Sequence, residues 1–485
     1  MSLVITVAVA LCAVWIVLIV VRSVLFRPVR IDGRAGEADV PPDAPFTTEQ
    51  TGASLSRMIR IPTVSAPAPA LNDGAPFAEF RELLAELYPR ITSSCLCERV
   101  GETGVLYTLK GRSPDRPTVL MAHYDVVPAD ETDWVHPAFS GHIDETGRIW
   151  GRGAIDTKVT LCAIMEAVER RLSEGFTPEH DVYLAFSGDE EVFGPSAPAI
   201  VALLESRGVR PALVLDEGGA VVDGIFPGVT SPCAVIGIAE KGMMNVELSV
   251  VSNGGHASAP PKNQPVRRLS RAIHRIAARP FPLRLVPAVA ALFDTLGRHA
   301  PFALRLIFAN LWCFLPVLKR LFSVAGGEME AMMRTTTCFT VLEGSAAFNV
   351  MPSVARAIIN IRILSGESSE KVLEGLRSRV ADPSVRMRVL YATEPTATAR
   401  LDGREWNLVS RAVRRTWDGT IVAPYLMVAC TDSRHFGRLC DTVLKFSALE
   451  LSREERASMH GRNECLPVKK LVKCCSFYYT LTGDL

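Results

Sequence analysis

Short apolar runs alternate with amphipathic stretches along most of this chain. Residues 117–122, 181–187 and 213–215 have the length and composition of buried strands. The stretches between such runs repeat apolar residues at helical spacing. Helices are predicted at 47–59, 77–88, 159–174, 198–207, 266–278, 369–380, 407–416 and 468–482. This alternation predicts an α/β fold.

Chemistry-bearing side chains follow the first of these runs. His123 and Asp125 lie two residues apart and share a face of the strand. A carboxylate beside an imidazole fixes the tautomer of a metal-ligating histidine. The glycine-rich loop at 151–153 then brings Asp156 to the head of the next helix. A lone His-x-Asp pair is also compatible with a structural histidine. The prediction of a metal site therefore depends on this pair together with the glycine-rich loop and Asp156.

Acidic pairs follow the next two runs. Glu190 and Glu191 follow the run at 181–187, and Asp216 begins the acidic turn after the run at 213–215. Adjacent carboxylates repel one another, and a solvated acidic loop is the alternative interpretation. Bound cations reverse that repulsion. Because open α/β sheets carry their sites at the carboxyl ends of strands, these side chains predict a metal site.

Two apolar segments stand apart from the pattern. Residues 2–21 are apolar, uncharged and long enough to span a bilayer, and arginines follow them. An uncleaved membrane anchor within residues 1–30 is favoured over a signal peptide, followed by a polar linker at 31–46. Residues 280–333 form an apolar insertion that Pro316, Lys319 and Arg320 interrupt. The insertion fits a wall for an acyl chain or a bilayer contact, and equally a packing or dimerisation element.

Composition excludes some classes of partner. The 485 residues carry 53 Lys and Arg against 52 Asp and Glu, with no basic stripe for nucleic acid. The 12 cysteines lack the spacing of a zinc ribbon or a disulfide scaffold, which favours free thiols. Free thiols and the arginines after the apolar segment favour a cytoplasmic catalytic domain. The sequence alone leaves the side of the membrane open.

A family resemblance rests on several motifs taken together. HYDVVP, WGRGAIDTK, SGDEEVFG and LDEGG resemble the M20 family of metallopeptidases. EKGMMNVELSV, GGHASAPP, FNVMPSVARAIINIRI, TDSRHF and MHGRNE resemble its carboxypeptidase S-like branch. The resemblance runs from about residue 50 to the C-terminus. It implies a three-layer αβα catalytic domain at 47–240 and 367–485, with an inserted α+β, ferredoxin-like lid domain at 241–366.

The resemblance also implies a set of site residues. The implied ligands of two zinc ions are His123, Asp156, Glu191, Asp216 and His460, with Asp156 bridging and with His123 and Glu191 on one ion. Glu190 is the implied general base and Asp125 the partner of His123. His256 is implied to stabilise the oxyanion, from the partner subunit in dimeric relatives, and Arg362 and Asn349 to bind substrate. A surface role for His256 and an internal salt bridge for Arg362 are the alternatives.

The function expected from these features is hydrolysis of an amide bond beside a free carboxylate. The apolar insertion and the anchor favour N-acyl amino acids, including N-fatty-acyl ones in a reversible reaction. A dipeptidase or carboxypeptidase is the alternative enzyme. A binding protein on an inactivated hydrolase fold is a second alternative. Expected partners are a small-molecule substrate, the membrane and a second copy bound through the lid domain.

Overall fold

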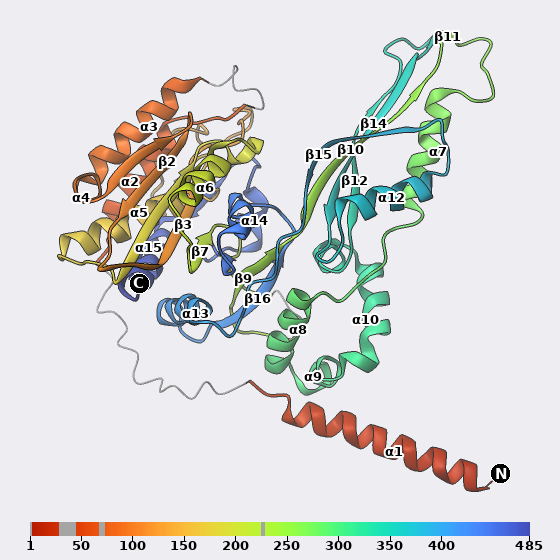
Figure 1. The fold of residues 1–485 in the computed structure, drawn as a ribbon, viewed down its shortest axis with the longest axis horizontal. Helices are drawn as coiled ribbons and strands as arrows, with labels where there is room; N and C mark the ends of the chain where they lie inside the picture. Colours follow the sequence, from red (N-terminus) through yellow and green to blue (C-terminus); the bar gives the residue numbers. More distant parts are fainter. Residues whose placement is uncertain (1, 29–44, 67–72, 225–227) are drawn as a thin grey trace.

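Two main sheets, two smaller ones and a group of helices make up the part of the molecule that the structure describes (Figure 1). The computed structural model describes residues 2–28, 45–66, 73–224 and 228–485. The expected linker at 31–46 lies almost wholly outside these described residues. The mixed α/β prediction is confirmed.

The large sheet has nine strands and carries the predicted metal-site residues. Its order is β1-β2-β6-β3-β7-β17-β9-β16, and β8 pairs with β9. The strands are β1 (Leu96–Val100), β2 (Gly104–Leu109), β3 (Ser113–His123), β6 (His180–Ser187), β7 (Leu213–Asp216), β8 (Val221–Val222), β9 (Cys233–Glu240), β16 (Ile421–Met427) and β17 (Val443–Lys445). The strands β6, β3 and β7 are parallel neighbours. Their carboxyl ends therefore meet at one edge, as the sequence predicts.

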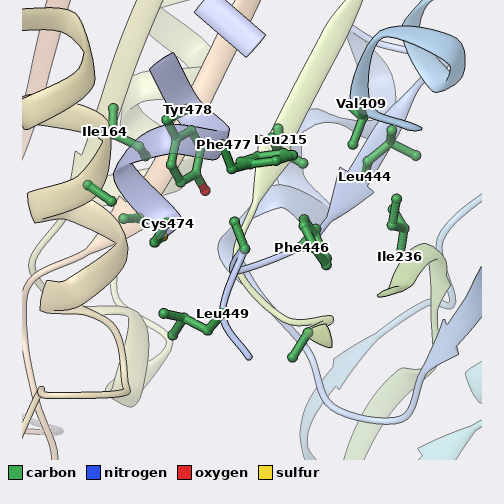
Figure 2. Packing of buried hydrophobic residues seen from close by; sticks show 14 of the residues in the cluster. Ile164, Leu215, Ile236, Val409, Leu444, Phe446, Leu449, Cys474, Phe477 and Tyr478 are labelled. Carbon is green, nitrogen blue, oxygen red and sulfur yellow. The ribbon is translucent and has the colours of Figure 1, made fainter. Parts of the chain in front are cut away.

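Helices cover both faces of the large sheet. One layer contains α2 (Thr48–Arg60), α3 (Gly74–Leu87), α4 (Pro89–Ser94), α5 (Lys158–Ser173), α13 (Arg404–Thr416) and α15 (Val468–Gly483). Figure 2 shows Phe477 of α15 and Phe446 with Ile164 and Leu215 in this core, and the two phenylalanine rings lie 5.4 Å apart. The opposite layer holds α6 (Ser196–Ser206) and η3 (Asp432–Arg438) over a second apolar cluster. The result is a three-layer αβα unit.

The small sheet is antiparallel, in the order β12-β14-β10-β15. Its strands are β10 (Gly242–Val251), β12 (Thr336–Glu343), β14 (Val354–Ile363) and β15 (Arg386–Thr393). Alternate residues of β14 are buried against α7 (Pro265–Ala277) and α12 (Ser369–Val380). The expected domain boundary at 366/367 therefore falls too early. The apolar face of α12, with Val372 and Leu376, packs into this core, and β15 pairs with β10 before the chain returns to the large sheet.

The apolar insertion folds into four helices, α8 (Pro287–His299), α9 (Phe302–Phe308), α10 (Leu311–Ala325) and α11 (Gly327–Ala331). The axes of α9 and α10 make an angle of 103°. The N-terminal helix α1 (Ser2–Leu25) contacts this group, and its residues 3–25 are apolar and long enough to cross a membrane. A signal sequence has the same character. Counted as one bent segment, α9 and α10 together are also long and apolar enough to cross a membrane.

Smaller elements complete the edges. A three-stranded sheet joins β18 (Cys465–Pro467), β5 (Arg148–Trp150) and β4 (His142–Ile143). The strands β11 (Gly255–His256) and β13 (Val350–Met351) pair at the outer end of the small sheet (Figure 1). The short helices are η2 (Glu190–Val192) after β6 and α14 (Arg453–Ser458) before His460. These connections bring motif residues from the early and the late part of the chain, such as His123 and His460, to one edge of the large sheet.

Candidate metal centre

His123 stands at the end of β3 with only 2% of its surface exposed. Its Nδ1 lies 3.0 Å from the backbone oxygen of Asp125 and 3.3 Å from Oδ1 of the same residue. Nδ1 is therefore the protonated nitrogen, and Nε2 is left to face the site. Asp125 is fully buried and accepts hydrogen bonds from Ser65 Oγ at 2.7 Å and from the amides of Glu190 and Glu191 at 3.1 Å. Asp125 thus fixes both the histidine and the acidic turn.

Asp156 lies between two histidines that are far apart in sequence. Its Oδ1 is 3.1 Å from Nε2 of His123, and its Oδ2 is 2.8 Å from Nε2 of His460. Each carboxylate oxygen therefore faces a different imidazole, which is the arrangement expected of a bridging ligand.

The ligand-type side chains gather into two groups that share Asp156. One contains His123, Asp156 and Glu217, and the other contains Asp156, Glu191 and His460. Within each group the candidate ligand atoms lie within 4.8 Å of one another. Glu191 Oε1 is 3.1 Å from His460 Nε2, so Glu191 belongs with His460 and not with His123 as expected.

Glu217, and not Asp216, reaches the first group. Its Oε1 lies 3.3 Å from His123 Nε2. The Asp216 carboxylate accepts hydrogen bonds from the backbone amides of Glu217 and Ser433, at 2.9 and 2.8 Å. Adjacent residues at a strand end point in opposite directions, so only one of the two can face the site. The expectation for Asp216 is corrected on this geometry.

Glu464 was missed as a functional residue, although it ends the quoted MHGRNE motif. It is fully buried, and its Oε1 accepts hydrogen bonds from the amides of Gly153, Ile155 and Asp156, at 3.1, 2.7 and 3.2 Å. Its Oε2 accepts one from Arg152 at 2.8 Å. Glu464 therefore holds the loop that presents Asp156.

Electrostatics at the centre show an excess of buried negative charge. Burial alone would lower the pKa of His123, but the nearby carboxylates, Glu217 first, outweigh it and raise this pKa well above its usual value. The hydrogen bond to Asp156 raises the pKa of His460 to about 10. Burial raises the pKa of Glu217 to about 8 and that of Glu190 well above its usual value. A cation bound here would relieve this crowding of carboxylates.

The donor set fits divalent metal ions. Two imidazoles and three carboxylates converge, and imidazole nitrogen with carboxylate oxygen is a ligand combination that zinc accepts. Glu190 is buried beside the groups, and its main-chain amide is fixed by Asp125 at 3.1 Å. Its carboxylate interacts electrostatically with His123, Glu217 and Glu191 and belongs to neither group.

The remaining predicted site residues lie on the small sheet, at its two ends. His256 and Asn349 are exposed at the outer tip, where the Ala257 amide donates to the Asn349 oxygen at 3.0 Å (Figure 1). Arg362 lies at the inner end, with Nη1 3.4 Å from Cys430 Sγ next to η3. Within one chain, the tip is therefore not brought to the metal groups, whereas Arg362 lies where the two sheets meet.

Histidine and carboxylate groups held this way at the strand ends of an α/β sheet define a metal-dependent hydrolase. The profile of Peptidase family M20/M25/M40 matches residues 119–483, and the chain belongs to this family. It is accordingly a metallopeptidase or amidohydrolase. The recognition from sequence motifs is confirmed.

Curated relatives cover most of the chain. N-fatty-acyl-amino acid synthase/hydrolase PM20D1 of Homo sapiens is 34% identical over 88% of this chain and 86% of its own. Probable carboxypeptidase S-like 2 of Dictyostelium discoideum is 33% identical over 84% of this chain and 79% of its own. Among solved structures, the M20 family metallo-carboxypeptidase Sso-CP2 from Sulfolobus solfataricus has a TM-score of 0.64 at 17% identity, covering 90% of this chain and 99% of its own. That structural likeness supports the fold alone.

Proposed function

We propose that this protein is a membrane-anchored, two-zinc hydrolase of N-acyl amino acids. The observation that carries the proposal is the sharing of Asp156 between two groups, each with its own histidine and its own glutamate. The proposed ligands of one ion are His123, Asp156 and Glu217, and those of the other are Asp156, Glu191 and His460.

Bound zinc would lower the pKa of a water and polarise the scissile carbonyl. The chain supplies the remaining chemistry. Glu190 takes the proton from the attacking water and gives it to the departing amine. Its burial raises its pKa, which suits a group that must both accept and release a proton. Asp125 keeps His123 in the required tautomer.

Arg362 is the proposed partner of the substrate's carboxylate. A guanidinium pairs with a carboxylate through two parallel hydrogen bonds. Among the described residues, its Nη1 donates to the weak acceptor sulfur of Cys430 at 3.4 Å, and its Nε donates to the Asn360 side-chain oxygen at 3.3 Å. These contacts hold the guanidinium without neutralising it, which argues against the internal salt bridge. His256 and Asn349 of a partner subunit would complete the site, since both lie at the outer tip of the small sheet.

The substrate class follows from the relatives. Those whose names state an activity on N-fatty-acyl amino acids match most of the chain, and the chain carries an apolar insertion whose helix α8 packs on β16 of the large sheet. Carboxypeptidase S-like relatives at similar identity favour a second candidate, cleavage of short peptides next to a C-terminus. Because both reactions break an amide beside a free carboxylate, the acyl side distinguishes them.

The ligand assignment is tested by a matched pair of variants. Glu217→Gln should lower the zinc content from two ions per chain to about one and abolish turnover, because its carboxylate faces His123. Asp216→Asn should keep both ions, because that side chain is held by the amides of Glu217 and Ser433 and belongs to neither ligand group. Elemental analysis of the purified full-length variants gives the metal content. Loss of zinc in Asp216→Asn and retention in Glu217→Gln would reverse the assignment.

The substrate class is tested by comparing kcat/KM for N-oleoyl-phenylalanine and for a neutral dipeptide, using the zinc-loaded full chain. We expect a clear preference for the acylated substrate, with no turnover of either substrate by Glu190→Gln. A preference for the dipeptide would establish the carboxypeptidase-like alternative. Hydrolysis by Glu190→Gln at the normal rate would remove Glu190 as the base.

A further inference from the structure

The apolar segment α1 is docked onto the insertion. The Arg22 guanidinium donates to the Ala309 oxygen at 3.1 and 3.3 Å. The Asn310 amide donates to the Ile19 oxygen and to Ser23 Oγ, both at 3.2 Å. Asn310 and Ser23 are fully buried. Polar side chains bridging two apolar helices in this way are typical of helix contacts inside membranes.

A second set of contacts fixes the end of α1 on α8. The guanidinium of Arg298 donates to the Arg27 oxygen at 3.1 Å and lies 4.5 Å from the centre of the Phe26 ring. The Trp15 ring meets Trp312 of α10 edge to face, with centroids 6.4 Å apart. A bilayer that encloses α1 is therefore brought against α9 and α10.

The depth of the contact follows from helix geometry. Ile19 and Ser23 precede Leu25, the last residue of α1, by six and two positions, or by about 9 and 3 Å at 1.5 Å per residue. Helices that lie in a bilayer interface are buried by about 5–10 Å. Figure 1 shows α10 running across the direction of α1. The hydrogen-bonded junction of α9 and α10 thus lies at the depth of an interfacial helix. Trp312 at the start of α10 reaches further in, to about 15 Å, because it meets Trp15 ten positions before Leu25.

The free surface of α10 has the composition of an interfacial helix. Its large exposed apolar residues are Trp312 (55% exposed), Val317 (57%), Leu321 (57%) and Val324 (83%). Val317, Leu321 and Val324 recur at helical spacing and form one stripe. Arg320 borders that stripe, and Lys319 lies on the opposite side of the helix. Long basic side chains extend to the headgroups while their stems lie on apolar surface.

We propose that α10 lies in the bilayer interface beside the C-terminal end of α1, with its apolar stripe on the acyl chains and Lys319 and Arg320 at the headgroups. The occupant of this surface is a lipid bilayer, because α1 requires one and is already fixed to the same helices. This inference rests on the proposed anchoring through α1 and is independent of the substrate. The protein is then held to the membrane by α1 and by α10, and the contacts between these helices set its orientation relative to the bilayer.

The test uses the full chain in bilayers of phosphatidylcholine and phosphatidylserine that contain photoactivatable lipids. One lipid carries the reactive group near the carbonyl end of its acyl chain and the other at its terminal carbon. Mass spectrometry then locates the adducts. We expect both lipids to label α1, and the shallow probe to label α10 several-fold more than the deep one.

Matched variants sharpen the result. Leu321→Asp should reduce labelling of α10 several-fold and leave α1 labelled, whereas Leu342→Asp, an equally exposed apolar position on β12, should change neither. Labelling of α1 without α10 would overturn the inference alone. Absence of label from α1 as well would overturn the proposed anchoring and this inference with it.

Discussion

The large sheet and the tip of the small sheet hold their histidines in opposite ways. His123 is buried, and carboxylates face both of its ring nitrogens. His256 is exposed, and its ring nitrogen contacts only Ser258, two residues away, with Oγ at 2.7 Å. Groups held before substrate arrives need no reorganisation during the reaction, whereas an exposed side chain takes its position from what it docks against. The molecule therefore combines a buried, preformed group of ligand-type side chains with a tip whose histidine is exposed.

The largest effect should come from removing the proposed base in the preformed region. Glu190→Gln should lower kcat about 10²- to 10⁴-fold, the usual contribution of general acid–base catalysis, while zinc stays bound. Steady-state kinetics and elemental analysis check this. Full zinc content with unchanged kcat would show that the base lies elsewhere.

A somewhat smaller effect is expected at the tip. His256→Ala should lower kcat about 10²- to 10³-fold, as loss of an oxyanion donor does, with normal zinc content. If His256 serves the partner subunit, a mixture of His256→Ala and Glu190→Gln should regain activity, because one site of each mixed dimer then has both residues. A mixture with no more activity than its components would contradict exchange of His256 between subunits.

The smallest effect on turnover should follow from weakening the hydrogen bonds that hold the Asp156 loop. Glu464→Gln should weaken zinc binding about 10- to 100-fold, since residues that orient ligands typically contribute that much. Turnover in saturating zinc should remain close to normal. Competition with a chelator gives the affinity, and Glu450→Gln, which removes an exposed carboxylate paired with Lys473, is the control. Equal zinc affinities in the two variants would deny Glu464 a positioning role.

The strand-end position of His123 and Asp125 could be predicted because one short stretch determines it. His123 and Asp125 follow an apolar run directly, and their spacing alone places both on one face. The choice between Asp216 and Glu217 could not be made in this way. A shift of one position reverses which side chain faces the site, and only the pairing of β7 in the sheet fixes it.

Contacts between distant segments were beyond sequence reasoning. Glu464 is an ordinary charged residue in the sequence, and its three main-chain hydrogen bonds exist only once β18 has paired with β5. The insertion was expected to be apolar without forming one continuous spanning helix, and it folds into four separate helices. Its docking on α1 depends on Asn310, which no periodicity distinguishes. The return of β15 to the small sheet was missed for the same reason.

The position of Glu464 also has a consequence for the newly made chain. This carboxylate holds the Asp156 loop, yet it lies 308 residues after Asp156. At synthesis rates of about 5–20 residues per second, it emerges about 15–60 s later. During that interval the loop lacks its support, although β3, β6 and β7 have already been made. The nascent protein therefore presents Asp156 on an unsupported loop, with weakened zinc binding, until the segment that contains Glu464 has been translated and folded.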